Sequence, residues 1–191
     1  LLGFRQTHER DIKDIIRKLD AIEIKKIDPT NPTDVRIDKG FFDGTGFFEN
    51  GYAVVAKNGK MGVINREGKV VVPIRYDFVN PPNEGTVLVR SNWRYGFVDL
   101  EGKELIRPMY DEALSFSYGL AAVKKGDAWA YINKDNKTVI GWELEHILSP
   151  FEKKIDDHGE EQIVSFVIYL GKSTYINQKF ECVPIKPYGC K

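Results

Sequence analysis

Few side chains in this sequence have types and spacings that could support chemistry. The three histidines are His8, His146 and His158, and none of them stands at the spacing of a metal-binding pair. The nucleophile elbow, the phosphate-binding loop and the dinucleotide fingerprint are all missing from the sequence. We therefore expect no catalytic residue, no metal site and no cofactor.

The densest acidic cluster is the run from Asp156 to Glu161, which contains four carboxylates and His158. A calcium loop alternates its ligands around a turn glycine, and this run does not follow that pattern. We interpret the run as a solvated loop. The alternative of lower rank is a hydrolase whose site lies in the segment 149–162.

Composition and charge narrow the possible partners. The 191 residues are 42% hydrophobic and 29% charged, which is ordinary for a globular chain. Lysine plus arginine equals aspartate plus glutamate at 28 each, so a nucleic-acid partner is not expected. No run approaches the roughly 18 apolar residues that a membrane-spanning helix needs.

The two cysteines, Cys182 and Cys190, match neither a zinc pair nor a redox motif. Free thiols are the favoured interpretation, because a disulfide between them requires an oxidising compartment. No signal peptide is visible. Localisation is therefore left open between the cytoplasm and the cell envelope.

A 34-residue period is the strongest feature of the sequence. Small residues recur at this spacing as Gly62, Gly96 and Ala130, which predicts a close backbone approach or a bulge within a strand. Acidic residues recur at the ends of the units as Asp77, Asp111 and Glu145. A residue that repeats in every unit is expected to do a structural task, so these carboxylates are predicted to be turn or cap acceptors.

The turns of each unit follow the same period. Asn58-Gly59 predicts a tight hairpin, because both residues tolerate a positive φ. The next turn carries Asn or Asp at its first position and Gly or Asn three residues later, which predicts a type I turn followed by a left-handed residue. The structural turn positions are Gly59, Asn65, Gly68, Asp99, Gly102, Asn133 and Asn136.

The pattern around Gly-Lys-Met-Gly-Val-Ile-Asn-x-x-Gly-Lys, which closes on Tyr76-Asp77, resembles the WG (KWG) repeats of bacterial proteins. The name-giving pair stands here as Met61-Gly62, Tyr95-Gly96, Trp129-Ala130 and Ser173-Thr174, so the resemblance rests on the surrounding frame. It covers about Phe47 to Tyr188. The resemblance implies a β-rich, non-enzymatic repeat module with no catalytic residues to carry over.

These observations predict a mainly β fold of three-stranded antiparallel repeats, stacked as a curved solenoid-like array. The alternative is a small propeller-like closure. The units are expected at 47–80, 81–114, 115–148 and, after an insertion at 149–162, at 163–191. The last unit is expected to be a cap in which Phe180 changes the turn type and packs inward. The units belong to a repeat domain at 35–191. An N-terminal segment, 1–34, with an amphipathic helix and a linker is expected to precede this domain.

The predicted function is a binding or scaffold module that recognises a protein or peptide along its repeat surface. The alternative is carbohydrate or cell-wall binding through exposed aromatic side chains, with a polysaccharide as the partner. The candidate ligand-binding residues are Trp93, Tyr95, Trp129 and Tyr131. Because aromatic residues also form the cores of sheets, the competing interpretation of these four is packing between repeats.

Overall fold

The computed structural model describes residues 42–185, and this part of the chain is built of β-strands without a helix. The strands form four antiparallel sheets, none of which closes on itself. No described segment is a helix with the length and apolar character that a membrane crossing requires. The N-terminal helix expected within residues 1–34 lies outside the described residues.

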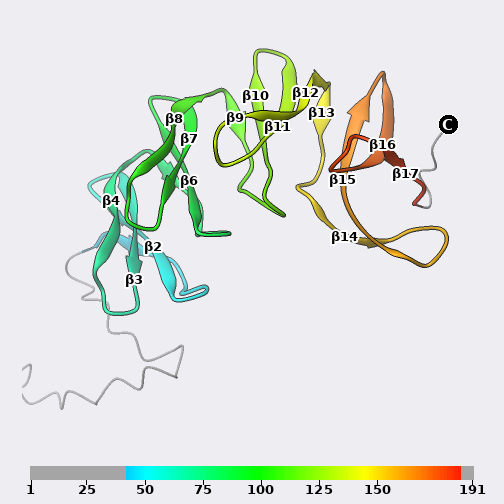
Figure 1. Ribbon diagram of the computed structural model, residues 1–191. Helices are drawn as coiled ribbons and strands as arrows, with labels where there is room; N and C mark the ends of the chain where they lie inside the picture. Colours follow the sequence, from blue (N-terminus) through cyan, green and yellow to red (C-terminus); the bar gives the residue numbers. More distant parts are fainter. Residues whose placement is uncertain (1–41, 186–191) are drawn as a thin grey trace, which may run out of the picture. The chain divides into compact units, whose positions relative to one another are not determined.

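Each sheet consists of strands that follow one another in the sequence, and we call each sheet with its turns a unit (Figure 1). The first unit contains β1 (Gly44–Thr45), β2 (Tyr52–Lys57), β3 (Lys60–Asn65) and β4 (Val70–Tyr76). The second contains β5 (Phe78–Val79), β6 (Thr86–Ser91), β7 (Arg94–Asp99) and β8 (Glu104–Tyr110). The third contains β9 (Glu112–Ala113), β10 (Ala121–Lys125), β11 (Ala128–Ile132) and β12 (Thr138–Leu144). The fourth contains β13 (His146–Ile147), β14 (Glu152–Ile155), β15 (Glu161–Tyr169), β16 (Lys172–Asn177) and β17 (Cys182–Val183).

The prediction of three strands per unit is wrong, because an additional two-residue strand begins each sheet and the fourth sheet has five strands in all. In the second unit this strand is β5, where Phe78 pairs with Arg90 and Val79 pairs with Val89. Only Asp77 separates β5 from the last strand of the preceding sheet. The chain therefore passes directly from the far edge of one sheet to the near edge of the next.

The turn that joins the second and third long strands has the predicted geometry in the first three units. In the first unit Gly68 adopts a φ of 77°, and the Asn65 Oδ1 accepts the Lys69 N–H at 2.9 Å. In the third unit Asn136 takes the left-handed position with a φ of 60°. Glycine and asparagine adopt this region at the lowest cost, which explains their recurrence every 34 residues.

The recurrent small residue inside the second long strand marks a close backbone approach, as the sequence predicted. A Cβ atom added at Gly96 would lie 2.5 Å from the Ile106 carbonyl oxygen and 2.6 Å from the Pro108 nitrogen. In the pairing of β7 with β8 the strand register shifts across Gly96, between Tyr95 and Phe97, and again after Phe97. The bulge brings β8 against β7 so closely that no side chain fits there.

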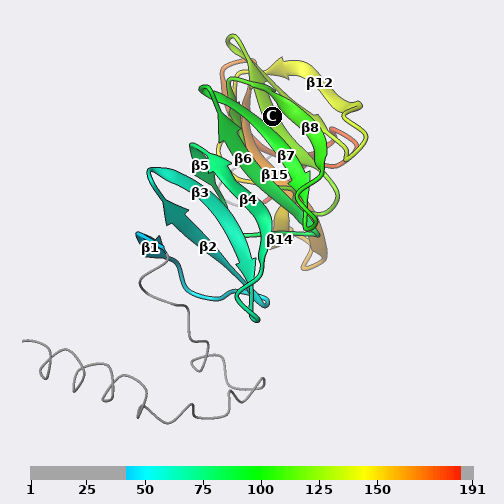
Figure 2. The same ribbon diagram turned by 90° about the vertical axis from the view of Figure 1, so that its left-hand side faces the viewer.

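Successive units are joined by contacts that repeat with the sequence period. The Asn83 amide donates to the Phe116 carbonyl at 2.8 Å, and the Ser117 hydroxyl donates to the Phe151 carbonyl at 2.7 Å. The Phe116 ring packs on Phe97 of the preceding unit, with 4.8 Å between the ring centroids. Neighbouring sheets lie beside each other in both views of the ribbon (Figure 1 and Figure 2). Each unit therefore completes the hydrophobic core of its neighbour.

The insertion contains a β-hairpin, and the acidic run forms its exposed turn, which agrees with the solvated loop expected there. Strand β14 pairs with the first half of β15, and the two are joined by a turn in which the Asp156 Oδ1 accepts the His158 and Glu160 N–H groups, each at 2.9 Å. Gly159 takes the left-handed position of this turn with a φ of 87°. This is the same turn that Asn65 and Gly68 form in the first unit.

The expectation for Phe180 is half wrong. Phe180 adopts a φ of 62°, and its N–H donates to the Asn177 carbonyl at 3.0 Å, so the turn keeps the type that it has in the other units. The ring is half-buried and packs edge-on against Tyr169, with 5.1 Å between the centroids. The inward packing was predicted correctly, and it offsets the cost of about 1–2 kcal/mol for a left-handed aromatic residue.

Cys182 is disulfide-bonded in the structure, so the interpretation of this residue as a free thiol is wrong. The sequence contains one other cysteine, Cys190, which lies outside the described residues.

Candidate functional site

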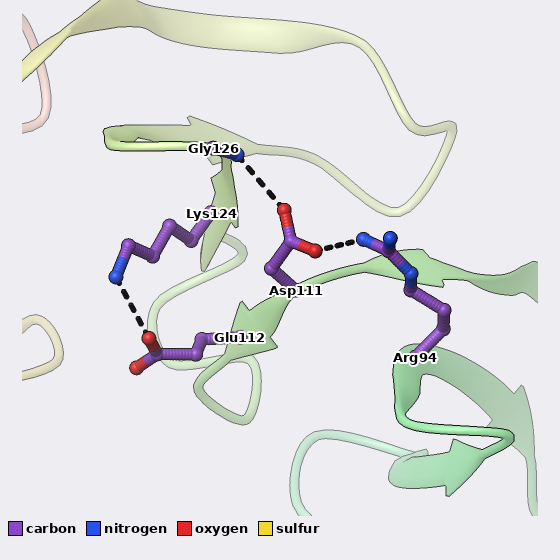
Figure 3. Close-up of polar contacts among 5 residues, drawn as sticks. All are labelled: Arg94, Asp111, Glu112, Lys124 and Gly126. Carbon is purple, nitrogen blue, oxygen red and sulfur yellow. Dashed lines mark hydrogen bonds and ion pairs between the residues drawn. The ribbon is translucent and has the colours of Figure 1, made fainter.

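The recurrent acidic residues hold successive units together. The Asp77 carboxylate accepts the Asn92 N–H at 2.8 Å, and the Asp111 carboxylate accepts the Gly126 N–H at 2.8 Å (Figure 3). Glu145 caps the corresponding hairpin of the fourth unit through the Gly171 N–H at 2.9 Å. The carboxylates thus act as turn acceptors, as the repetition in the sequence predicted.

Two of these carboxylates also bind a cation of the preceding unit. Lys60 at the start of β3 pairs with Asp77 at 2.5 Å, and Arg94 at the start of β7 pairs with Asp111 (Figure 3). The Lys60 hydrogen bond, followed by the Asn92 N–H, holds the pKa of the Asp77 carboxyl below its ordinary value. Asp77 is therefore charged near neutral pH, and each of its two carboxylate oxygens makes one contact.

In the second and third units a row of three side chains crosses the first three strands of the sheet next to this carboxylate. In the third unit the row is Glu112, Lys124 and Trp129. The Lys124 ammonium pairs with Glu112 at 2.8 Å (Figure 3). It also lies 5.7 Å from the centre of the Trp129 ring. The cation of this unit therefore has both a carboxylate and an aromatic partner.

In the second unit the same row is Phe78, Arg90 and Tyr95. The Arg90 guanidinium lies over the rings of Phe78 and Tyr95, at 5.8 and 5.7 Å from their centres. Phe78 occupies the register position at which Glu112 stands in the third unit. Arg90 therefore has aromatic neighbours where Lys124 has a carboxylate.

The buried Nε of Arg90 has no hydrogen-bond acceptor in the described part of the chain. Leaving such a donor without an acceptor costs about 1–3 kcal/mol, and more for a charged group. The Tyr95 hydroxyl is 3.5 Å from another guanidinium nitrogen, which is a weak contact. Arg90 interacts electrostatically with the nearby Asp77 carboxylate, but it forms no ion pair within residues 42–185.

Trp93 extends this cluster at the tip of the hairpin between β6 and β7. Its side chain is 80% exposed, and the Arg90 guanidinium lies 5.1 Å from its ring centre. Asn92 and Trp93 form a two-residue turn with φ values of 51° and 63°. Such a turn prefers glycine at its second position, which is occupied by Gly59 in the first unit and by Gly171 in the fourth.

A tryptophan at this position is unfavourable for folding in two respects. The left-handed conformation costs about 1–2 kcal/mol for a residue with a side chain, and the large apolar ring remains in water. The stacking on Arg90 returns about 0.5–1 kcal/mol at an exposed position. Local strain of this kind is typical of functional positions.

Asp77, Arg90, Asn92 and Trp93 line an open pocket of about 320 Å³, which we call the Trp93 site. Its walls combine a flat aromatic ring, a guanidinium and a carboxylate. Large aromatic and arginine side chains are the residues that contribute most to binding in protein interfaces. The arrangement is suited to binding and includes no nucleophile paired with a base.

The structure places the four sequence candidates differently. Trp93 is exposed and lines the pocket, and Tyr95 is half-buried beside it. Trp129 and Tyr131 are only 7% and 1% exposed and belong to the core of the third unit. Burial raises the pKa of the Tyr131 hydroxyl, which hydrogen-bonds Ser165 of the fourth unit. These two residues therefore cannot form a surface ladder with Trp93.

Arg90 is the site residue that the sequence reasoning missed. A comparison of the aligned units could have found it. Arg90 and Lys124 are equivalent cations, 34 residues apart. The residue 12 positions before Lys124 is the acidic Glu112, whereas the residue 12 positions before Arg90 is Phe78. Within residues 42–185 no group of three or more potential metal ligands is arranged to hold an ion. In particular, Asp156 uses its carboxylate as a turn acceptor.

The fold and the contacts between units define a protein of tandem β-repeats. The family of WG-containing repeats matches residues 42–60, 61–92 and 95–129. This match confirms the resemblance seen in the sequence over residues 42–129. No curated protein matches the chain significantly.

Proposed function

We propose that this repeat module binds a protein or peptide at its surface and performs no catalysis, and that the Trp93 site is where the partner docks. The observation that carries the proposal is the exposed Trp93 in a left-handed turn position, where two other units have glycine. Such a residue is costly for the folded chain alone. A partner that covers the indole would remove its exposure to water.

The architecture supports an extended binding surface. We propose that the four units form an open, solenoid-like stack, because backbone and side-chain contacts with the period of the sequence join each unit to the next. Four strands, the number in each of the first three units, are also usual in a propeller blade, so strand number does not distinguish the two architectures. Small-angle scattering tests the proposal, since a closed ring has a smaller maximum dimension than an open stack.

A phage-displayed library of random peptides, selected against the repeat protein, tests the docking site. Peptides selected by the wild-type chain are expected to lose at least about tenfold in affinity for the Trp93→Gly variant, which keeps the turn and removes the ring. A matched control is Trp142→Ala, which removes a partly exposed tryptophan of β12 that lies outside the Trp93 site. Selected peptides that bind all three proteins equally would contradict the proposal.

Carbohydrate binding is the second candidate function, and the free face of Trp93 beside Asp77 and Asn92 favours it specifically. A sugar ring can stack on an exposed indole while polar side chains bind its hydroxyl groups. Binding on a glycan array that disappears with Trp93→Ala, together with a peptide selection that yields no binder, would favour this candidate over the first.

A further inference from the structure

We propose that the Trp93 site recognises an acidic segment of a partner protein, in which a glutamate or aspartate side chain pairs with Arg90 and an adjacent apolar side chain lies on Trp93. This inference rests on the proposed function and specifies the chemistry of the partner. It is based on the difference between the second and third units at one equivalent position.

The third unit shows how the repeat itself satisfies a cation in this row. Lys124 on β10 pairs with the carboxylate of Glu112, its register partner on β9, at 2.8 Å. In the second unit the register partner of Arg90 is Phe78. The position that supplies the carboxylate in the third unit therefore supplies an aromatic ring in the second, and the cation is kept.

The nearest carboxylate of the second unit is already committed. Asp77 pairs with Lys60 at 2.5 Å and accepts the Asn92 N–H at 2.8 Å. Among the ion pairs of residues 42–185 none includes Arg90, and the buried Nε of this residue has no acceptor. Lys60 and Arg90 both stabilise the charged form of Asp77, and these three side chains together carry one positive charge in excess.

An acidic peptide complements each of these features. A carboxylate matches the planar guanidinium better than any neutral acceptor does. The ring of Trp93 offers an exposed apolar surface directly beside that charge, with 5.1 Å between the guanidinium and the ring centre. The partner would supply in trans the carboxylate that Glu112 supplies to Lys124 within the chain. This precedent favours a protein partner over an acidic polysaccharide.

A peptide array tests this inference with the full chain. Each peptide carries a glutamate next to one apolar residue, in both orders, and has a counterpart with glutamine in place of glutamate. We expect the glutamate peptides that bind to do so at least about tenfold more tightly than their glutamine counterparts. The difference should decrease as the salt concentration rises and should vanish in the Arg90→Gln variant.

The third unit suggests a sharper variant, Phe78→Glu. It places a carboxylate at the register position of Glu112, so that Arg90 is satisfied within the chain while Arg90 and Trp93 both remain. We expect about a tenfold loss of affinity for the glutamate peptides. Lys124→Gln is the matched control, since it removes a cation that is already paired, and it should change the affinity by less than about twofold. Circular dichroism verifies that each variant is folded.

Equal binding of glutamate and glutamine peptides would overturn the role of Arg90 and leave the proposed function intact. Binding of oligogalacturonate, but of no peptide, would overturn the assignment to a protein partner. If no glutamate peptide binds, the inference is wrong. The proposed function is then still judged by the random-peptide selection, which does not depend on charge.

Discussion

The Asp111 carboxylate accepts the Gly126 N–H at 2.8 Å, across the boundary between the second and third sheets of the protein (Figure 3). Its other oxygen pairs with the Arg94 guanidinium of the second sheet. One side chain thus connects two hairpins that are far apart in the sequence. The same connection is made at the preceding boundary by Asp77.

Removing the Asp111 carboxylate should therefore weaken the joint between the second and third units. We expect Asp111→Ala to lower the free energy of unfolding by about 1 kcal/mol, since a charge-assisted turn contact at a partly exposed position is lost. Asp111→Asn should cost less, because its amide oxygen still accepts the Gly126 N–H. Urea unfolding measures both, and Ala and Asn variants that both match the wild type would contradict the role of the joint.

The lowered pKa of Asp77 predicts an acid-sensitive contribution to stability. An aspartate whose pKa is lower in the folded than in the unfolded state stabilises the fold fully above its ordinary pKa of about 3.9. The contribution declines as the pH falls below that value, and it is lost below the pKa of the folded state. We expect the stability of Asp77→Asn to depend less on pH in this acidic window. The measurement is the free energy of unfolding of wild type and variant as a function of pH. Equal slopes of the two profiles in this window would refute the prediction.

Two glycines of the second unit should respond very differently to alanine. At Gly96 an added Cβ meets backbone atoms of β8 at 2.5 and 2.6 Å, and we expect Gly96→Ala to cost about 1–3 kcal/mol through overpacking. At Gly85 no atom lies within 4 Å of an added Cβ, so only the positive φ of 73° is strained, at about 1 kcal/mol. Thermal unfolding compares the two, and a larger loss at Gly85 would contradict the close approach of β8.

The periodic features of this fold could be predicted from the sequence because each is imposed by a single local requirement. Gly68 recurs because the turn needs a positive φ, and Gly96 recurs because two strands approach closely. Strand β5 was missed because two residues are too few to show an alternating pattern. The geometry of the Asp156–Gly159 turn was missed although it follows the same rule as Asn65 and Gly68, since the acidic run was interpreted only as a solvated loop.

The site was harder to predict than the fold because burial depends on contacts between units. The Phe151 ring of the segment 149–162 covers Tyr131, with 4.7 Å between the ring centroids, and no property of the Tyr131 strand indicates this. Arg90 likewise has no ion-pair partner on β5, because Phe78 stands there at the position of Glu112 in the third unit. Only the exposed Trp93 could be inferred from its place in a hairpin turn.

The disulfide of Cys182 predicts a redox-dependent mass. The intact protein, isolated without reductant, should be lighter than the reduced chain by two hydrogen atoms if the bond joins Cys182 to the one other cysteine of the sequence. Iodoacetamide should modify Cys182 only after reduction. Mass spectrometry measures both, and alkylation of Cys182 in the unreduced protein would contradict the bond.

The central claim is that Trp93 is retained for binding and not for stability, and the unfolding free energy of Trp93→Gly tests it most directly. Glycine removes about 1–2 kcal/mol of left-handed strain and gives up about 0.5–1 kcal/mol of stacking on Arg90. We therefore predict that the variant is as stable as the wild type or more stable by up to about 1 kcal/mol. A loss of about 1 kcal/mol or more in urea unfolding would show that Trp93 supports the fold, and would contradict the account.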